Sequence, residues 1–256
     1  MVHGNPTWSY FYRNLISLLS SRYRVIAVDH VGCGLSDKPQ KYSYTLAQHI
    51  DNLHNLLSQL AVTSYSLIVH DWGGAIGMGL ATRYPERVEK IVVLNTAAFL
   101  SKRIPFRISL CKLPLIGPLI VRGLNGFARP ATFMAVSKPM GPAVSAAYIA
   151  PYDNWAHRVA VSAFVQDIPL KASHPSYETL RAIDESLVTL RDAGVPMLIL
   201  WGGKDFCFDK VFYSEWRKRF PEAEYHYFED GGHYILEDKL DEIKPILLRF
   251  FPGHEE

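Results

Sequence analysis

The chain has few cysteines and a net charge close to zero. Its 256 residues include three cysteines, Cys33, Cys111 and Cys207, whose spacing matches neither a disulfide framework nor a metal site. We therefore expect a reducing, cytoplasmic setting, with no bound metal and no cofactor. Lys and Arg total 27 against 25 Asp and Glu, a formal charge of +2, so the composition provides no basic surface for nucleic acid.

Long apolar runs are missing as well. The most apolar region, ISLCKLPLIGPLIVRGL at 108–124, is interrupted by Lys112, Pro114, Pro118 and Arg122. A transmembrane helix needs ~20 consecutive apolar residues, so this stretch is too broken to span a membrane. We expect it to form part of a helical cap or a surface that meets an apolar substrate, and we find no secretory leader at the start of the sequence.

Short β-branched runs supply the main structural signal. With 48% hydrophobic residues the chain is long enough for one large α/β domain. Continuous apolar runs suit strands that are buried on both faces of a parallel sheet. Helical patterns lie between the runs, and this alternation predicts a doubly wound, mostly parallel sheet. The runs occupy 23–29, 66–71, 90–95, 195–202 and 223–229.

One helix and one insertion complete the predicted organisation. In the stretch 45–60, Thr45 and Gln48 form a capping box. Five apolar residues of this stretch share one face, namely Leu46, Ile50, Leu53, Leu57 and Leu60. About a hundred residues without a strand signal then separate the third run from the fourth. We predict a helical cap at 100–190 inserted into an α/β core made of 1–99 and 191–256.

The motif VHDWGG at 69–74 is typical of a tight strand-to-helix turn. Such a turn projects its apex residue above the carboxyl end of the strand, beside a helix N-terminus that favours negative charge. Here the apex is Asp71, and Gly73 and Gly74 permit the close turn. Val69 stands where serine hydrolases usually have a glycine, so we expect an aspartate nucleophile. An aspartate that merely caps the next helix is the alternative.

An acid and a histidine follow in the chain order that this arrangement requires. Asp205 ends the strand in LILWGGKD, although Asp209 and Asp167 are rival candidates. His233 lies in the glycine-flanked loop of FEDGGHYILED, after the last predicted strand. We predict a catalytic set of Asp71, Asp205 and His233.

A carboxylate nucleophile restricts the classes of substrate that the site can attack. Aspartate has an ordinary pKa of about 3.9, so it is ionised at neutral pH without help from a base. It attacks a carbon electrophile to form an ester, and His233, oriented by Asp205, is then free to activate water. Peptide and simple ester hydrolysis are disfavoured, because the same attack would give a labile anhydride.

Two neutral donors are candidates for holding a leaving group. Asn5, in VHGNPTW, follows a His-Gly turn of the kind that supplies oxyanion-hole N–H groups. Trp72 adds an indole N–H next to the nucleophile. Alternatively, Asn5 organises the turn before Pro6, and Trp72 fills space in the core.

These motifs together resemble one branch of a known family. HGNPTW, DHVGCGLSDKP, VHDWGG, WGGKD and GGHYILED, in this order, are similar to haloalkane dehalogenases of the α/β-hydrolase fold, over essentially the whole chain. The resemblance implies that Asp71 is the nucleophile, His233 the base and Asp205 the acid. It also implies that Asn5 and Trp72 clamp the leaving group.

The cap looks like a more specific group. VVLNTAAF, VRGLNGFARP, APYDNWAHRVAVSAFVQDIPL and KDFCFD resemble the olefin-biosynthesis β-lactone decarboxylases. That likeness implies conversion of a long-chain cis-β-lactone, a small hydrophobic substrate, into an alkene and CO2, beside other olefin-biosynthesis enzymes. Two cap tyrosines are also expected, with Tyr148 and Tyr152 among the candidates.

Three alternatives stay open beside the β-lactone decarboxylase. The first is a haloalkane dehalogenase. The second is an epoxide hydrolase, although these enzymes typically have a bulky residue where Asn5 stands. The third is a non-catalytic binding protein on the same scaffold, which would not need a complete triad with two clamp donors.

The resemblance also predicts a defect at the start of the chain. In this fold the His-Gly loop leaves a central strand that pairs between the strands at 23–29 and 66–71. Only Met1 and Val2 precede His3 here. We therefore expect that N-terminal strands are missing from the sequence as given. Unpaired ladder groups and an open apolar slot would follow, with low stability.

Overall fold

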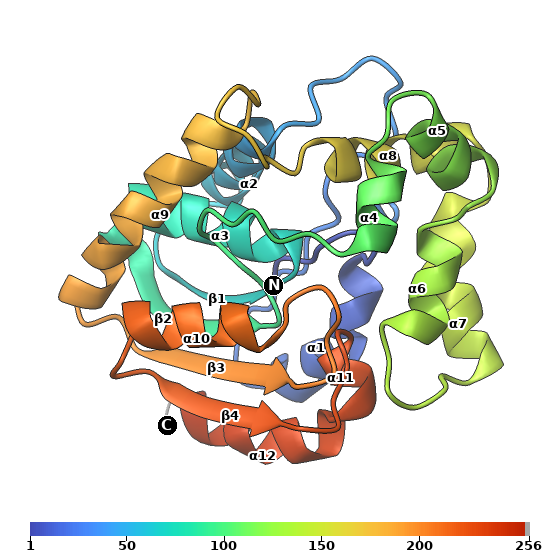
Figure 1. Cartoon of the computed structure of the whole chain (residues 1–256). Coiled ribbons are helices and arrows are strands. Elements are labelled where there is room, and N and C mark those ends of the chain that lie inside the picture. Colours follow the sequence, from blue (N-terminus) through green and yellow to red (C-terminus); the bar gives the residue numbers. More distant parts are fainter. Residues whose placement is uncertain (254–256) are drawn as a thin grey trace.

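Four parallel strands form the centre of the molecule. The computed structural model describes residues 1–253. The strands are β1 (Tyr65–His70), β2 (Val88–Leu94), β3 (Met197–Gly202) and β4 (Glu224–Phe228), in the spatial order β1-β2-β3-β4. Every pairing is parallel, and Val93 lies opposite both Val69 and Ile199. The carboxyl ends of all four strands consequently meet at one edge of the sheet (Figure 1).

The other regular elements of the described chain are helices. The α-helices are α1 (Arg13–Leu19), α2 (Leu46–Gln59), α3 (Trp72–Arg83), α4 (Phe106–Cys111), α5 (Ile116–Pro118), α6 (Ala128–Met134), α7 (Pro142–Ile149), α8 (Val159–Gln166), α9 (Tyr177–Asp192), α10 (Lys210–Arg219), α11 (Ile235–Asp238) and α12 (Leu240–Phe250). The 3-10 helices are η1 (Ser9–Tyr12), η2 (Pro85–Arg87), η4 (Ala150–Tyr152) and η5 (Ala156–Arg158), and η3 (Leu119–Gly123) is a π-helix. None of the helices described is long and apolar enough to cross a membrane.

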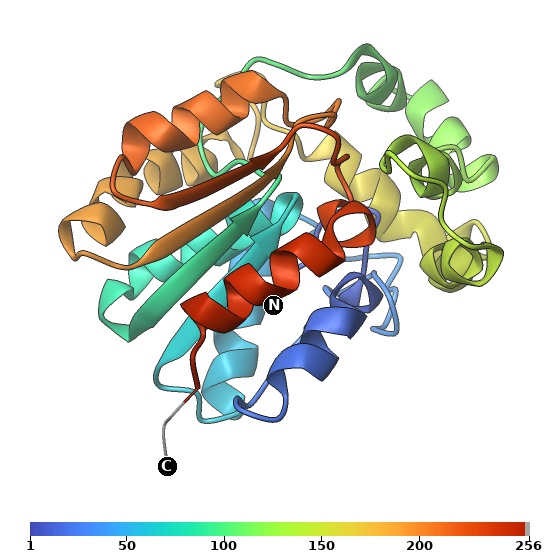
Figure 2. The same cartoon turned by 90° about the horizontal axis from the view of Figure 1, so that it is seen from below.

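Two helical layers sandwich the sheet (Figure 2). On one face α2, α3, α9 and α10 pack in a core that includes Ile50, Ile76 and Trp216. On the other face α1, α11 and α12 pack around Leu15 and Leu247. Burial of both faces explains the continuous apolar character of the strand sequences. The predicted α/β-hydrolase fold with a doubly wound parallel sheet is confirmed.

Four of the five predicted strands are confirmed within two residues at each end. The helix predicted over 45–60 is α2, and the Gln48 N–H donates to the Thr45 hydroxyl at 3.4 Å. The second half of the capping box does not form, because the Gln48 side chain donates instead to Asn52.

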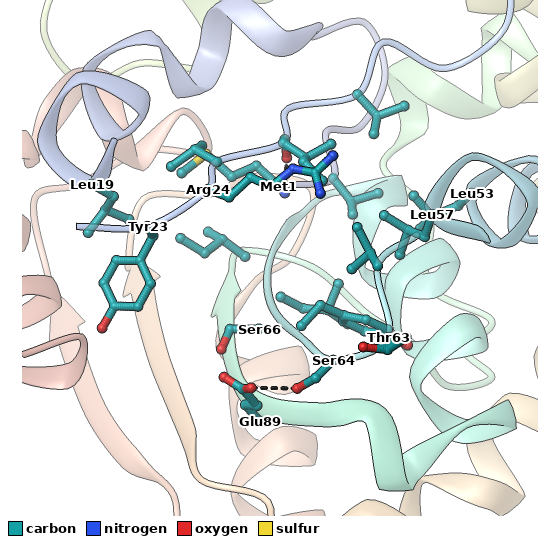
Figure 3. A pocket seen from close by; sticks show the side chains of 18 of the residues that line it. Met1, Leu19, Tyr23, Arg24, Leu53, Leu57, Thr63, Ser64, Ser66 and Glu89 are labelled. Carbon is teal, nitrogen blue, oxygen red and sulfur yellow. Dashed lines mark hydrogen bonds between the residues drawn. The ribbon is translucent and has the colours of Figure 1, made fainter. Parts of the chain in front are cut away.

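The strand predicted over 23–29 is wrong. Only Val28 of this segment takes part in a β-bridge, and its partner is Val2, which also bridges to Val69. Next to this bridge, the Ile26 carbonyl accepts a hydrogen bond from the Met1 amino group at 2.7 Å. A cavity of about 360 Å³ lies in this place, between the segment and β1 (Figure 3). The apolar slot predicted from the sequence is therefore present.

The insertion between β2 and β3 carries α4 to α8, which lie together at one side of the sheet (Figure 1). They have a small core of their own around Val121, Tyr152 and Val161. Helix α9, by contrast, packs into the main core through Ile183 and Leu187. The division into a cap at 100–190 and a core at 1–99 and 191–256 stays a proposal.

Candidate active site

Asp71 occupies a sharp turn between β1 and α3. Its φ of 51° lies in the left-handed region that side chains with a Cβ rarely adopt. The turn is held from β2, because the Asp71 N–H donates to the Asn95 carbonyl at 3.3 Å and the Thr96 hydroxyl donates to the Asp71 carbonyl. A Cβ on Gly73 would lie 2.0 Å from the Val2 carbonyl oxygen. Only glycine therefore allows this approach of α3 to the N-terminal segment.

The three residues predicted as a catalytic set lie together at the carboxyl edge of the sheet. His233 Nδ1 is 2.7 Å from Asp205 Oδ2, and His233 Nε2 is 3.7 Å from Asp71 Oδ2. All three residues are buried. His233 comes from the loop between β4 and α11, and Asp205 follows β3. The imidazole thus lies between two carboxylates, with one edge bonded and the other directed at Asp71.

Asp205 is fixed by donors on both oxygens. Its Oδ2 accepts a hydrogen bond from Asn95 Nδ2 at 2.9 Å, and its Oδ1 accepts from the N–H groups of Cys207 at 2.6 Å and Phe208 at 3.0 Å. These bonds hold the carboxylate in one orientation. Asp205 therefore orients His233 through the contact between Oδ2 and Nδ1.

The two rival aspartates have other structural partners. Asp209 caps α10 by accepting from the Val211 N–H, and it forms an ion pair with Arg103. Asp167 accepts from the Leu46 N–H at 2.7 Å and from the Ser176 hydroxyl at 2.6 Å. Neither bonds to His233, which leaves Asp205 as its carboxylate partner.

Two backbone N–H groups hold the Asp71 carboxylate. The Asn5 N–H donates to Oδ1 at 2.6 Å, and the Trp72 N–H also bonds to the carboxylate. The chain approaches closely here, since a Cβ on Gly4 would lie 2.1 Å from Oδ1. Burial raises the pKa of Asp71 above its ordinary value, while His233 and the two N–H groups oppose this shift. The site stabilises negative charge where an oxyanion hole would lie.

The two predicted clamp side chains reach the same cavity but differ in their contacts. Asn5 Nδ2 donates to the Val161 carbonyl of α8 at 3.1 Å, so part of its donor capacity holds the cap. The indole of Trp72 packs against Phe164, with ring centroids 5.4 Å apart. Both line one cavity with Asp71. Their role toward a leaving group stays a prediction.

The protonation of His233 is set by opposing effects. Burial lowers the pKa of His233, but Asp205 and Asp71 outweigh it, so the pKa lies above the ordinary value. Two contacts that sequence reasoning missed position the ring. His70 Nε2 lies 2.9 Å from the His233 carbonyl, and Phe208 stacks on the imidazole at 5.8 Å between centroids. His70 directly precedes Asp71, but the sequence gives no sign that its ring meets the loop of His233.

Two cavities meet at Asp71. One has a volume of about 130 Å³ and the other about 190 Å³, and both reach Asp71 and Asn5. Apolar side chains dominate both. The first is lined by Phe99, Ile104, Val165, Ile168, Leu180 and Phe212, and the second by Cys111, Ala131, Met134, Phe206 and Tyr234. Ile108, Phe127 and Cys207 belong to both.

The cap contributes to these cavities only in part as predicted. Within 108–124, Ile108 and Cys111 line them, whereas Leu115 is 83% exposed. Neither Tyr148 nor Tyr152 is among the lining residues. Tyr148 instead donates to Glu237, and Tyr152 is fully buried in the cap core.

The fold and the strand-turn-helix at Asp71 define an α/β hydrolase. Residues 1–112 match a family model described as alpha/beta hydrolase fold. A putative ancestral haloalkane dehalogenase superposes with a TM-score of 0.88 at 23% identity, covering 98% of this chain and 89% of that one. The haloalkane dehalogenase DbeA from Bradyrhizobium elkani gives 0.86 at 24%, with 98% and 88% covered.

Sequence relatives narrow the family further. The chain is 48% identical over 262 residues to the cis-3-alkyl-4-alkyloxetan-2-one decarboxylase of Shewanella oneidensis, covering 100% of this chain and 82% of the relative. Identity to the protein of the same name from Xanthomonas campestris pv. campestris is 41%, with 98% and 86% covered. Haloalkane dehalogenase 2 of Mycobacterium tuberculosis is 29% identical over the same shares. The chain belongs to the family of the cis-3-alkyl-4-alkyloxetan-2-one decarboxylases, and the predicted resemblance is confirmed.

Proposed function

We propose that the protein converts a cis-3,4-dialkyl β-lactone into an alkene and CO2, with Asp71 as the nucleophile. The observation that carries this proposal is the pair of apolar cavities that meet at Asp71. A β-lactone with alkyl groups on adjacent ring carbons presents two apolar chains that diverge from the reacting centre. Each chain then has a cavity of its own, and the identity of 48% to a decarboxylase of this class supports the assignment.

In the first step Asp71 Oδ2 attacks the ring carbon that bears the lactone oxygen. A carbon–oxygen bond forms to the enzyme as the ring carbon–oxygen bond breaks, and the electron pair of the broken bond leaves on a substrate carboxylate. Asp71 Oδ2 is the oxygen that faces His233, while Oδ1 is held by the Asn5 N–H. A protonated His233 and the donors of Asn5 and Trp72 would stabilise the carboxylate that develops.

In the second step the substrate carboxylate leaves as CO2. The carbon–carbon bond to the carboxylate breaks, its electron pair forms the double bond, and the ester bond to Asp71 breaks to restore the aspartate. Neither a proton nor water is consumed. The raised pKa of His233 suits this sequence, because no neutral base is required.

The remaining parts of the proposal concern the surroundings of the enzyme. We infer that residues 100–190 act as the cap that encloses a small hydrophobic substrate over the core of 1–99 and 191–256. From the same functional assignment we infer that the protein is cytoplasmic. We also infer that it acts together with other enzymes of olefin biosynthesis.

The test is alkene formation from a synthetic cis-3,4-dialkyl-oxetan-2-one, followed by gas chromatography and mass spectrometry. We expect the Asp71→Asn variant to lose activity by roughly 10³-fold or more, since the nucleophile is removed. Asp209→Asn is the matched control, because Asp209 caps α10 outside the triad, and it should keep most of the activity. Alkene production by Asp71→Asn at the wild-type rate would refute the proposal.

Haloalkane dehalogenation is the second candidate. His233 Nε2 faces Asp71, which is the geometry of a base that activates water against an aspartyl ester. Bromide release from a bromoalkane, with an ester on Asp71 accumulating in His233→Ala, would support this reading. If no electrophile leaves an adduct on Asp71 by mass spectrometry, a binding protein becomes the better description.

A further inference from the structure

One side of the cap is both apolar and exposed. Its residues come from α4, α5, the link between these helices and the first position of η3. The opposite side of the same elements packs on α8 through Cys111 and Val121. The exposed residues are therefore additional to those that form the core of the cap. They are six large apolar side chains, called here the outer cap face: Phe106, Leu110, Leu113, Leu115, Ile116 and Leu119.

We propose that the outer cap face binds the surface of a bilayer that contains anionic phospholipid. Single exposed leucines are common on proteins, but a group of this size within 14 residues of chain marks a surface that meets a partner or a lipid. Phe106 is 75% exposed and Leu115 is 83% exposed. Leu115 also has a φ of 63°, which glycine or asparagine adopts at lower cost. Its side chain adds little packing to the fold, so we assign its use to a contact outside the molecule.

The charge around the outer cap face favours a lipid surface over a second copy of this chain. Residues 100–152 contain seven Lys and Arg and neither Asp nor Glu. Since the whole chain has 27 basic and 25 acidic residues, 20 basic and 25 acidic residues remain for the rest of it. Two such segments placed face to face would repel each other, whereas anionic headgroups attract both. The small net charge of the chain thus conceals a basic region at the cap.

The basic side chains of this region are available to headgroups. Within residues 1–253, Arg103 is the one member of the seven that forms an ion pair with a carboxylate, that of Asp209. Both side chains of this pair are exposed, so solvent and salt weaken it. Lys102 and Arg107 are exposed beside the outer cap face. Exposed Lys and Arg next to exposed Leu and Phe are the composition of a helix that lies in a membrane interface.

The outer cap face belongs to a helix that also borders the cavities at Asp71. Ile108 of α4 lines both cavities, whereas Phe106 and Leu110 of the same helix are exposed. Figure 1 shows α4 and α5 as neighbours on the cap side of the molecule. Because an α-helix is about 10 Å across, a bilayer on this face would lie about one helix diameter from the cavities. Delivery of a long-chain substrate from the bilayer would follow, and this consequence alone rests on the proposed function.

The test measures binding of the whole protein to vesicles without substrate, so it can fail independently of the proposed reaction. The probe is phosphatidylcholine vesicles with about 30 mol% phosphatidylglycerol. We expect the protein to sediment with them, and to bind pure phosphatidylcholine vesicles at least about tenfold more weakly. Added salt should weaken the binding. Hydrogen exchange over residues 106–119 should slow on the vesicles, while exchange at Ile199, inside the sheet, stays unchanged.

Two pairs of variants separate the outer cap face from general adsorption. Leu115→Glu should weaken binding at least about tenfold, because it removes an inserted apolar side chain and adds a negative charge. Val188→Glu makes the same kind of change on α9, at a residue that is 39% exposed, and should alter binding less than about twofold. Lys102→Glu should weaken binding at least about fivefold. Its control is Lys244→Glu on α12, which should have little effect.

Several results would overturn the proposal. Absence of co-sedimentation would leave a protein as the occupant of the face. Equal binding of the wild type and Leu115→Glu, or equal binding to vesicles with and without phosphatidylglycerol, would remove the specific role of the face and of its charge. A wild-type oligomer that Leu115→Glu dissociates without lipid would make a second copy the occupant. If circular dichroism showed that Leu115→Glu does not fold, the exchange measurement on the wild type would decide, and unchanged exchange over 106–119 would refute the docking.

Discussion

At the scale of single residues, Asn95 joins two parts of the site. Its carbonyl accepts from the Asp71 N–H, and its side chain donates to Asp205 and to the Gly202 carbonyl. The Gly202 N–H donates back to Asn95 Oδ1 at 2.8 Å. Asn95 thus holds the turn at Asp71 through its backbone carbonyl and orients Asp205 through its side-chain amide.

Removing this amide should impair catalysis more than folding of the core. We expect Asn95→Ala to lower kcat roughly 10- to 100-fold, because His233 loses its fixed partner orientation. KM should change little, since Asn95 lines neither cavity at Asp71. Steady-state kinetics with a β-lactone measure both values. A variant with normal kcat would show that Asp205 needs no support from Asn95.

The pH dependence should differ between the two candidate reactions. The pKa of His233 lies above 6.5, so the ring is protonated below that raised value. Hydrolysis of an aspartyl ester needs neutral His233, and bromide release should therefore fall as the pH drops through it. β-Lactone decarboxylation consumes no proton and should persist at that pH. Stopped assays from pH 5 to 9 distinguish the two profiles.

A second pH limit concerns Asp71, the proposed nucleophile. Burial raises the pKa of Asp71 above 3.8, and only the ionised carboxylate attacks. Activity toward either substrate should consequently fall on the acid side at a pH above 3.8, provided that circular dichroism shows the protein still folded. An acid limb at or below this value would show that the two N–H donors outweigh burial.

Sequence reasoning located the three candidate catalytic side chains but not the groups that hold them in place. Asp71, Asp205 and His233 follow recognisable turn and strand-end motifs, so their assembly could be predicted. The bond from the Asn5 amide to α8 could not, because Val161 is far away in the chain and exposes only a backbone carbonyl. Contacts that depend on backbone atoms leave no signature in residue type.

At the scale of elements, Asp167 links the cap to the core. It ends α8 and accepts from Leu46, the first residue of α2, and from Ser176, just before α9. The residue is 7% exposed, so its loss would leave a buried backbone donor without a partner.

We expect Asp167→Ala to lower the free energy of unfolding by about 2–4 kcal/mol. Asp209→Ala, which removes an exposed helix cap, should cost only about 1 kcal/mol. Urea unfolding followed by circular dichroism measures both. If both variants lowered the free energy of unfolding equally, the burial of Asp167 would add nothing to its contribution to stability.

The elements also show where local sequence fails as a guide. Residues 23–28 have the composition of a buried strand, yet they form a single bridge at Val28. A segment forms a strand only when a neighbouring segment offers backbone N–H and carbonyl groups for pairing. Here Met1 and Val2 supply only two residues of such a neighbour. The residues of this segment favour a strand, but a strand did not form because its backbone has too few pairing partners.

At the scale of the whole molecule, stability should be graded across the sheet. β2 and β3 are paired on both sides, whereas in the segment 24–28 a β-bridge forms only at Val28. We expect hydrogen exchange to be slowest at Val92, Val93 and Ile199 and fastest, among the segments that flank the sheet, at Val25 and Ile26. Exchange followed by mass spectrometry tests this, and equal protection of both regions would contradict it.

The position of Met1 has a consequence for handling the protein. Burial lowers the pKa of its α-amino group to about 5, and this group donates to the Ile26 carbonyl beside the cavity that Leu67 also lines. Residues joined ahead of Met1, an affinity tag included, would enter that cavity and change the packing of the segments around it.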